Sequence, residues 1–198
     1  MSGQKQHVDK FRKILLRQHL MGTGLVGAAY VPFIGDGDLA VELYSGLRIY
    51  GADLDLERVA VAQSRLPDAK VVKADCDKWP FPRCEEEFVL ADFDAFSNPY
   101  KALKAFWIRA RKEERVILFG TDGLRQGIKR NRATKRLPDG AETKATTPQL
   151  REQYNFWWPR FVLPWLVALV APYTIVQEMK YLRRDMLYWG IVVDSTKA

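Results

Sequence analysis

The chain has 198 residues, 47% of them hydrophobic, and carries 31 lysines and arginines against 24 acidic residues, a net charge of +7. This composition is that of a globular protein with one substantial core, and it argues against intrinsic disorder and against two full domains. Two cysteines and two histidines are too few for a disulfide framework or a zinc cluster, so we expect no metal and a reducing, cytoplasmic environment. The positive charge favours an anionic partner, nucleic acid first among them.

Strand and helix patterns alternate along most of the chain. A basic helical segment over residues 8–21, within an N-terminal extension of residues 1–28, comes before the first predicted strand. We predict strands at residues 30–34, 48–52, 70–74, 88–91 and 115–119, and helices at residues 38–44, 57–66 and 99–111. Such alternation at short spacing is typical of a parallel sheet with helical crossovers.

The end of the chain breaks this alternation. A polar and basic segment over residues 121–148 leads into a helical segment, and its most apolar part, residues 161–173, is shorter than the roughly 20 residues that cross a bilayer. We expect that part to be buried core or a wall of the substrate site, without membrane contact. Two strand-like runs over residues 174–183 and 186–193 then predict an antiparallel hairpin at the edge of the sheet. We therefore expect a single α/β domain over residues 1–198, with a Rossmann-like, mostly parallel sheet.

Informative residues stand where the predicted strands end. Gly35 and Gly37 follow the first strand with Asp36 between them, and Asp53 and Asp75 follow the second and third strands. In an open parallel sheet, ligands bind beyond the carboxyl ends of the strands. The glycines permit a tight turn and a close approach to a ligand, and Asp53 stands at the distance from Gly35 where a carboxylate can accept both ribose hydroxyls.

The run from Gly35 to Ala40 also satisfies the G-x-G-x-x-G/A pattern of nicotinamide cofactors, and it can equally be a tight turn without a ligand. Three features favour a different nucleoside. Asp36 and Asp38 crowd the helix start, which suits a cationic sulfonium better than a pyrophosphate. Asp75 can meet an adenine amino group, and the terminal hairpin is foreign to the dehydrogenase plan. Among the function classes considered, a nicotinamide dehydrogenase ranks last, because the sequence has no catalytic Tyr-x-x-x-Lys motif at the position where that class requires it.

This order of features resembles the class I S-adenosylmethionine-dependent methyltransferases. The matching positions are Gly35 and Gly37, Asp53, Asp75, residues 92–100 and the hairpin of residues 174–193. Phe33 stands where that family often has an acid and Leu39 where it has a third glycine, and Asp36 or Asp38 can replace the acid. The resemblance implies S-adenosylmethionine as cofactor, with residues 35–37 at its methionine, Asp53 at its ribose and Asp75 with Cys76 at its adenine. The implied cofactor-binding residues are Phe33, Gly35, Asp36, Gly37, Asp53, Leu54, Asp75, Cys76 and Asp92.

Residues 92–100, with the sequence DFDAFSNPY, combine acids, an amide, a proline and aromatic rings. Methylating an exocyclic amine requires a group that accepts its hydrogens and the released proton, and an aromatic ring holds a flat base by stacking. The segment resembles the Asp-x-Asp-Pro-Phe-Gly-Ser-Pro motif of tRNA guanine N2-dimethyltransferases, with matches at Asp92, Asp94, Phe96 and Pro99. Alternatively, the acids cap the helix that follows.

The same segment is similar to the Asn-Pro-Pro-Tyr motif of DNA amino-methyltransferases through Asn98, Pro99 and Tyr100. These resemblances imply Asp94 as the carboxylate at the acceptor amine, with Asp92 and Asn98 also in the catalytic group. They imply substrate contacts for Phe96, Pro99 and Tyr100.

Four cations after the fifth predicted strand, Arg125, Lys129, Arg130 and Arg132, have no acid among them, and we expect them to grip phosphates unless they are a solvated surface. The hypothesis is therefore an S-adenosylmethionine-dependent N-methyltransferase acting on a base in RNA or DNA, with tRNA slightly preferred. A methyltransferase for a small molecule or a protein, and a nucleic-acid-binding module without catalysis, remain the alternatives.

Overall fold

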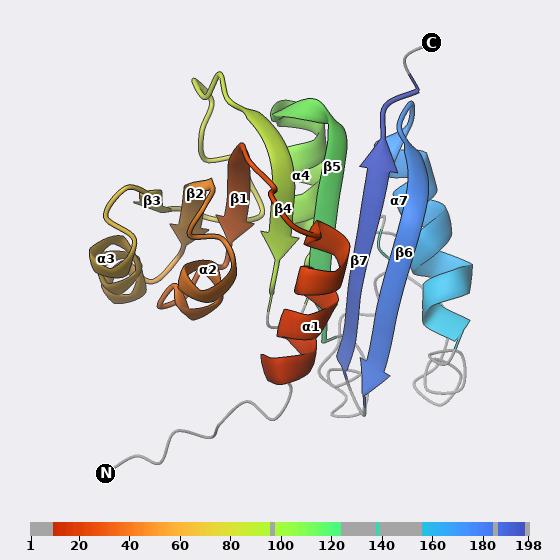
Figure 1. Cartoon of the computed structure of the whole chain (residues 1–198), viewed down its shortest axis with the longest axis horizontal. Coiled ribbons are helices and arrows are strands. Elements are labelled where there is room, and N and C mark those ends of the chain that lie inside the picture. Colours follow the sequence, from red (N-terminus) through yellow and green to blue (C-terminus); the bar gives the residue numbers. More distant parts are fainter. Residues whose placement is uncertain (1–9, 96–97, 124–137, 139–155, 184–185, 197–198) are drawn as a thin grey trace.

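The computed structural model describes residues 10–95, 98–123, 138, 156–183 and 186–196. A seven-stranded sheet runs through the molecule, with helices on both faces (Figure 1). Its strands are β1 (Ala28–Pro32), β2 (Arg48–Asp53), β3 (Lys70–Lys73), β4 (Glu87–Phe93), β5 (Arg111–Asp122), β6 (Thr174–Arg183) and β7 (Met186–Asp194). The helices are α1 (Lys10–Met21), α2 (Asp38–Leu43), α3 (Leu56–Arg65), α4 (Tyr100–Arg109) and α7 (Leu163–Val170), and a π-helical turn, η2 (Trp158–Val162), precedes α7.

The strand order is β3-β2-β1-β4-β5-β7-β6. Strands β1 to β5 are parallel, and β7 runs antiparallel to both β5 and β6. The predicted α/β fold, with a mostly parallel sheet and a C-terminal antiparallel hairpin, is therefore confirmed. The carboxyl ends of β1, β2 and β4 point to the same edge of the sheet, which is the lower edge in Figure 1. The residues that follow these strands consequently meet along one rim.

Two strands start earlier than the sequence predicts, because pairing with a neighbour decides where a strand starts. β1 begins at Ala28, since Ala28 pairs with Arg48 and is fully buried. β5 begins at Arg111, although residues 111–115 are all charged, because Arg111 pairs with Glu87 at the start of β4. The backbone hydrogen bonds of a sheet do not depend on side-chain polarity. The first five residues of β5 can therefore all be charged, because that end of the strand is exposed or only partly buried.

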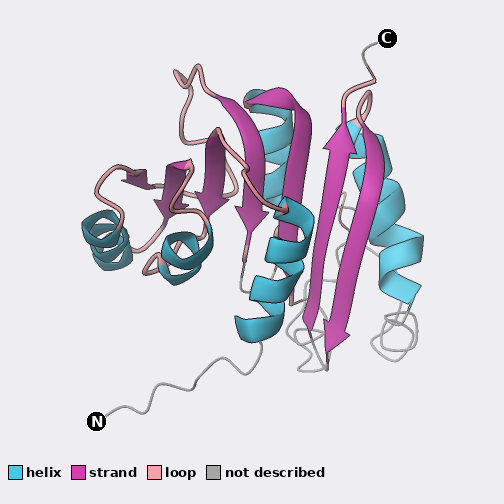
Figure 2. Cartoon of the chain, viewed as in Figure 1, coloured by secondary structure: helices cyan, strands magenta, loops and turns pink. Residues whose placement is uncertain are grey.

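Helices lie on both faces of the sheet (Figure 2), and a separate cluster of buried apolar residues fills each face. Helices α1, α2 and α3 cover one face, where Leu16 and Leu20 of α1 belong to the same buried cluster as Tyr44. Helices α4 and α7 cover the other face, with Phe106 and Trp189 in its core. The predicted N-terminal extension is therefore part of the packed structure from Lys10 onward.

The apolar residues 161–173 form the end of η2, helix α7 and the turn that follows. Val162, Leu166 and Val170 are buried at four-residue spacing, whereas Val167 is 54% exposed. This segment thus contributes one helical face to the core, as one of the two interpretations of the sequence predicted. Within the described ranges, no helix is both long enough and apolar enough to traverse a bilayer.

The close packing of β5 against β7 generates a first prediction. Gly120 pairs with Trp189, and a Cβ at Gly120 would overlap Cζ2 of that fully buried indole. We expect Gly120→Ala to lower the free energy of unfolding by about 1–3 kcal/mol, because the indole has no space to move into. Thermal denaturation followed by circular dichroism measures the change. Gly46→Ala is the control, since a Cβ there meets nothing within 4 Å. An unchanged melting temperature in Gly120→Ala would contradict this packing.

Candidate cofactor and acceptor site

The turn after β1 brings the glycines against the acid that ends β2. Phe33, Gly35 and Gly37 have left-handed backbone conformations, with φ of 59°, 56° and 80°. The Gly35 N–H donates to Oδ2 of Asp53 at 3.0 Å, so the turn and the acid are in direct contact. A Cβ at Gly35 would meet nothing within 4 Å, whereas one at Gly37 would lie 3.4 Å from Cα of Ala62 in α3. Gly35 therefore leaves open space beside the turn, and Gly37 allows α3 to pack closely.

Asp53 has hydrogen-bonding capacity to spare. Its Oδ2 accepts the Gly35 N–H, and its Oδ1 accepts the Asp55 N–H at 3.0 Å. A carboxylate offers about four lone-pair sites, so about two remain, as many as the two hydroxyls of a ribose require. The neighbouring Leu54 side chain is 64% exposed and offers an apolar surface beside this acid. Together, Asp53 and Leu54 have the properties that a nucleoside sugar and its base require.

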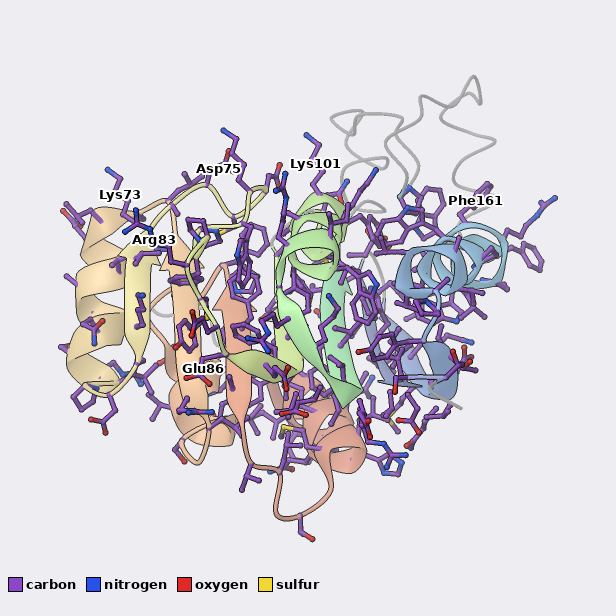
Figure 3. All side chains as sticks on the ribbon, turned by 90° about the horizontal axis from the view of Figure 1, so that it is seen from above. Lys73, Asp75, Arg83, Glu86, Lys101 and Phe161 are labelled. Carbon is purple, nitrogen blue, oxygen red and sulfur yellow. The ribbon has the colours of Figure 1, made fainter. Side chains whose placement is uncertain are left out.

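Asp75 follows β3 and remains an anionic acceptor. The Asp77 N–H donates to its Oδ1 at 3.1 Å, and Lys78 Nζ lies 3.3 Å from Oδ2. These two interactions, the backbone hydrogen bond first, lower the pKa of Asp75. Hydrogen bonds to its other lone pairs are open to an adenine amino group. Figure 3 shows Asp75 on the side of the sheet that α4 covers.

Cys76 ties the loop after β3 to the end of β1. Its Sγ accepts the Phe33 N–H at 3.4 Å and lies 3.5 Å from the carbonyl oxygen of Ala52. Burial, reinforced by the nearby Asp53 and Asp75, raises the pKa of Cys76 to about 11. The side chain therefore stays a thiol at neutral pH and holds the backbone in place, without the character of a nucleophile.

The two acids of the glycine turn have different surroundings. Asp38 Oδ1 pairs with Nη1 of Arg65 at 2.5 Å, and the same guanidinium donates to the backbone oxygen of Asp36 at 3.0 Å. The Asp36 side chain is exposed and has no ion pair with any described residue. Of the two carboxylates that the sequence places near a cationic ligand, Asp36 has no ion pair with the described residues, whereas Asp38 shares an exposed and therefore weak pair with Arg65.

Asp92, at the end of β4, is buried in an ion pair that we call the α1 clamp, formed by Arg17, Tyr44 and Asp92. Arg17 Nε and Nη2 donate to the two Asp92 oxygens, each at 2.7 Å, and the Tyr44 hydroxyl donates to Oδ2 at 2.7 Å. Asp92 and Arg17 are each 1% exposed. Burial alone would lower the pKa of Arg17. The Asp92 carboxylate outweighs this effect, so the net pKa is raised and the guanidinium stays charged. Asp92 therefore joins β4 to α1 and to Tyr44 at the end of α2, and its carboxylate is buried.

Asp94, two residues later, sits at the rim between α1 and β5. Lys13 Nζ lies 2.6 and 2.9 Å from its two oxygens, and the Thr121 hydroxyl donates to Oδ1. Burial acts to raise the pKa of Asp94, but Lys13 and Arg17 outweigh it and lower that pKa. Oδ1 accepts two hydrogen bonds and Oδ2 only one, so Oδ2 can accept one more. The carboxylate is thus held ionised and oriented, with one acceptor site left.

Asn98 and Tyr100 organise the start of α4. Asn98 Oδ1 accepts the Tyr100 N–H at 2.9 Å, which caps the helix. Tyr100 is 1% exposed; its hydroxyl donates to Asp122, and its ring meets Trp165 edge-on with centroids 5.3 Å apart. Pro99 is buried beside them. The ring expected to stack on a substrate base is therefore inside the core in this structure.

The remaining predicted substrate residues, Phe96, Arg125, Lys129, Arg130 and Arg132, lie outside the described residues. Sequence reasoning missed Lys13, Arg17, Tyr44 and Thr121 as partners of the two acids. The sequence did hold a signal for α1. Arg17 lies on the same helix face as Lys13 and Leu20, and a cation on a face with buried leucines indicates a buried acidic partner.

Among the described residues, no group of His, Cys, Asp and Glu is arranged to hold a metal ion.

The strand order, the glycine turn and the reversed last strand give this chain the fold of the class I S-adenosylmethionine-dependent methyltransferases. No protein-family model matches the chain, and no curated protein matches it in sequence. Solved structures do match. The N-methyltransferase NodS from Bradyrhizobium japonicum, in complex with S-adenosylhomocysteine, is 11% identical, with a TM-score of 0.61 over 96% of this chain and 88% of NodS.

Two further structures with bound S-adenosylhomocysteine share this fold. ChlM, the magnesium protoporphyrin IX methyltransferase from Synechocystis, is 11% identical, with a TM-score of 0.54 over 94% of this chain and 82% of ChlM. TrmK from M. capricolum is also 11% identical, with a TM-score of 0.52 over 94% of this chain and 69% of TrmK. At this identity the likeness establishes the fold, and the chemistry is argued from the residues.

The α1 clamp generates a prediction about stability. Replacing Arg17 with methionine leaves the buried Asp92 charge with Tyr44 and no cation. We expect the free energy of unfolding to fall by about 3–5 kcal/mol, the usual loss when one partner of a buried pair is removed. Chemical denaturation measures it. Arg58→Met is the control, because Arg58 is 58% exposed and its nearest acid, Asp55, is 3.8 Å away. Equal effects of the two replacements would be inconsistent with the clamp.

The lowered pKa of Asp94 generates a prediction about pH. A carboxyl whose folded-state pKa is depressed stabilises the protein above its unfolded pKa of about 3.9, and loses that effect as pH falls through the folded pKa. Asp94→Asn is therefore expected to destabilise the fold by about 1.5–3 kcal/mol at pH 7 and by progressively less below about pH 4. Denaturation across this pH range tests it, with the exposed Asp68→Asn as control. A pH-independent difference would contradict the ion pair with Lys13.

Proposed function

We propose that this protein is an S-adenosylmethionine-dependent N-methyltransferase that acts on an exocyclic amine of a nucleic-acid base, with tRNA as the preferred acceptor. The observation that carries the proposal is the contact between Gly35 and Asp53 at the carboxyl edge of a methyltransferase-type sheet, with about two lone pairs of Asp53 left for a ribose. The proposal treats residues 1–198 as a single catalytic domain in the cytoplasm.

The cofactor would extend along the rim from β1 to β3. When bound, S-adenosylmethionine supplies a methyl group on a positively charged sulfonium. Asp53 accepts hydrogen bonds from the ribose, Leu54 packs on the adenine and Asp75 accepts from the adenine amino group. Asp36 faces the charged methionine end, where Phe33 replaces the acid common in this family. Gly35 leaves room for this end, because nothing lies within 4 Å of where its side chain would start.

Asp94 is the residue that we assign to the acceptor amine. Its free Oδ2 site can accept one N–H of the amine, which directs the nitrogen lone pair toward the methyl group. The new N–C bond forms as the C–S bond breaks, and the nitrogen then releases one proton. Because Lys13 and Arg17 keep the pKa of Asp94 low, the carboxylate passes this proton on to solvent and stays ionised. Asp92 takes no direct part and acts by holding β4 to α1.

A nucleic acid is supported as the acceptor by two features. The chain carries a net charge of +7, and a run of cations without acids follows β5 in the sequence, where it includes Arg125, Lys129, Arg130 and Arg132. The resemblance of residues 92–100 to the motif of tRNA guanine N2-dimethyltransferases supports a base amine. Phe96 in that segment is the aromatic residue that remains for stacking on the base, since Tyr100 is buried.

Two variants separate cofactor binding from catalysis. Asp53→Ala is expected to weaken S-adenosylhomocysteine binding by about 100-fold in calorimetry, because two hydrogen bonds to a charged group are lost. Asp94→Asn is expected to keep that affinity and to lower kcat by about 100-fold or more. Asp68→Asn, in the exposed turn after α3, should change neither.

The acceptor is identified by incubating the protein with radiolabelled S-adenosylmethionine and separate pools of tRNA, rRNA, DNA, protein and small metabolites. Digestion of the labelled nucleic acid to nucleosides then identifies the product, which we expect to be a base methylated on nitrogen. Label in protein or in small molecules alone would overturn the nucleic-acid acceptor but not the cofactor. Failure of the wild-type protein to bind S-adenosylhomocysteine would remove the cofactor assignment as well.

A further inference from the structure

We infer that a groove along α4, outside the cofactor rim, binds the phosphate backbone of the nucleic-acid substrate. This α4 groove has a volume of about 580 Å³ and lies between α4 and the loop after β3. Its walls include Lys78 and Trp79 from the loop, and Lys101, Lys104, Ile108 and Arg109 from the helix. The inference rests on the proposed function, because it concerns the substrate of the same enzyme.

The groove is strongly positive. Four of its lining residues are cations, and the single carboxylate among them is Asp77. Lys101 lies 3.7 Å from Asp77, and Lys78 lies 3.3 Å from Asp75, but all four of these side chains are at least 40% exposed. Ion pairs as exposed as these contribute about 0–1 kcal/mol, so they yield readily to a phosphate. Lys104 and Arg109 have no ion pair with any part of the chain that the structure describes.

Helical spacing places these cations in one row. Residues 101, 104, 105, 108 and 109 recur at intervals of three and four, so they share the outer face of α4, while Leu103, Phe106 and Trp107 face the core. At 1.5 Å per residue, the row from Lys101 to Arg109 is about 12 Å long. Measured along the axis of a duplex, one strand has one phosphate per about 3.4 Å, so about 12 Å of axis corresponds to roughly three to four phosphate steps. The row thus suits a chain of regularly spaced anions.

Apolar groups in the same groove favour a nucleic acid over an acidic protein segment. Ile108 is 62% exposed, and Trp79 is half-buried, held edge-on by Tyr30 with centroids 5.0 Å apart. A fixed aromatic wall beside a row of cations is the arrangement by which proteins bind nucleic-acid strands, through stacking and phosphate contacts together. An acidic peptide would use the cations, but only its occasional aromatic residues could stack on the indole, whereas every nucleotide carries a base.

The groove lies next to the proposed cofactor site, because Lys78 in its wall contacts Asp75. Asp77 and Lys78 come directly after Asp75 and Cys76, which we assign to the adenine. Figure 3 shows Asp75 and Lys101 on the same side of the molecule, with both side chains directed outward. A strand bound along α4 therefore passes beside the cofactor edge, and it contacts cations that are separate from those of the segment after β5.

The test measures binding of fluorescein-labelled, unfractionated tRNA by fluorescence anisotropy, without cofactor and over a series of KCl concentrations. The test variant is Lys104→Ala/Arg109→Ala. Each lost phosphate contact should lower the slope of log Kd against log salt by about 0.7–0.9. The slope of the double variant should therefore be about 1.4–1.8 lower than that of the wild-type protein. Between about 50 and about 200 mM KCl, the wild-type protein should then lose roughly tenfold more affinity than the variant.

The matched control is Arg58→Ala/Lys180→Ala, which removes two exposed cations elsewhere, on α3 and on the edge strand β6. It should retain the wild-type slope. All three proteins should melt at similar temperatures, since the four side chains are exposed. Unlabelled tRNA should compete, and polyglutamate at equal charge should compete poorly.

An unchanged salt slope in Lys104→Ala/Arg109→Ala would overturn the groove while leaving the proposed function intact, provided that the wild-type protein still methylates tRNA. Equal competition by polyglutamate would also overturn it, in favour of an acidic protein partner. If the wild-type protein neither binds nor methylates tRNA, DNA or rRNA, the nucleic-acid acceptor and the groove fail together, and S-adenosylhomocysteine binding then shows whether the cofactor assignment stands.

Discussion

The buried ion pair between Arg17 and Asp92 is the interaction on which the arrangement of the candidate site depends. A carboxylate with 1% of its surface exposed needs a full set of donors, and Arg17 and Tyr44 supply them from α1 and α2. This requirement joins three elements that are distant in sequence at the end of β4. It also anchors α1, a helix that comes before β1, to the sheet.

The second acid of the same strand end has a different environment because α1 places Lys13 one turn before Arg17. Asp94 reaches the rim, where Lys13 and Thr121 fix its orientation and the nearby cations keep it ionised. Two carboxylates separated by one residue thus have separate tasks: one holds the helix, and the other remains able to accept a hydrogen bond. Strand alternation puts both acids on the side that α1 covers, and the difference arises from depth: Asp92 is buried within β4, whereas Asp94 lies just beyond the end of that strand with 18% of its side chain exposed.

The fold could be predicted because its signals are local. The glycine turn, the acids after β2 and β3 and the C-terminal hairpin each depend on residues close together in sequence, and the structure contains all of them in the expected order. The positions of Tyr100 and of the strand over residues 111–115 could not be predicted in this way. Tyr100 looks like a substrate aromatic in its motif, but Asp122 and Trp165 draw it into the core. In the charged run, Arg111 and Lys112 pair with β4 and Arg115 pairs with β7, and no local sequence pattern predicts these partners.

The sequence by itself determined the class of fold and that Gly35, Asp53 and Asp75 stand along one rim, where we propose that a nucleoside binds, because strand ends of a parallel sheet converge whatever the details of packing. Only the tertiary structure decided which acids keep hydrogen-bonding capacity. Asp92 is fully engaged by Arg17 and Tyr44 in the core, whereas Asp94 keeps an acceptor site. The physical reason is that the ion-pair partners come from elements far away in the chain. Whether a carboxylate can still accept a hydrogen bond is therefore decided only when the chain is packed.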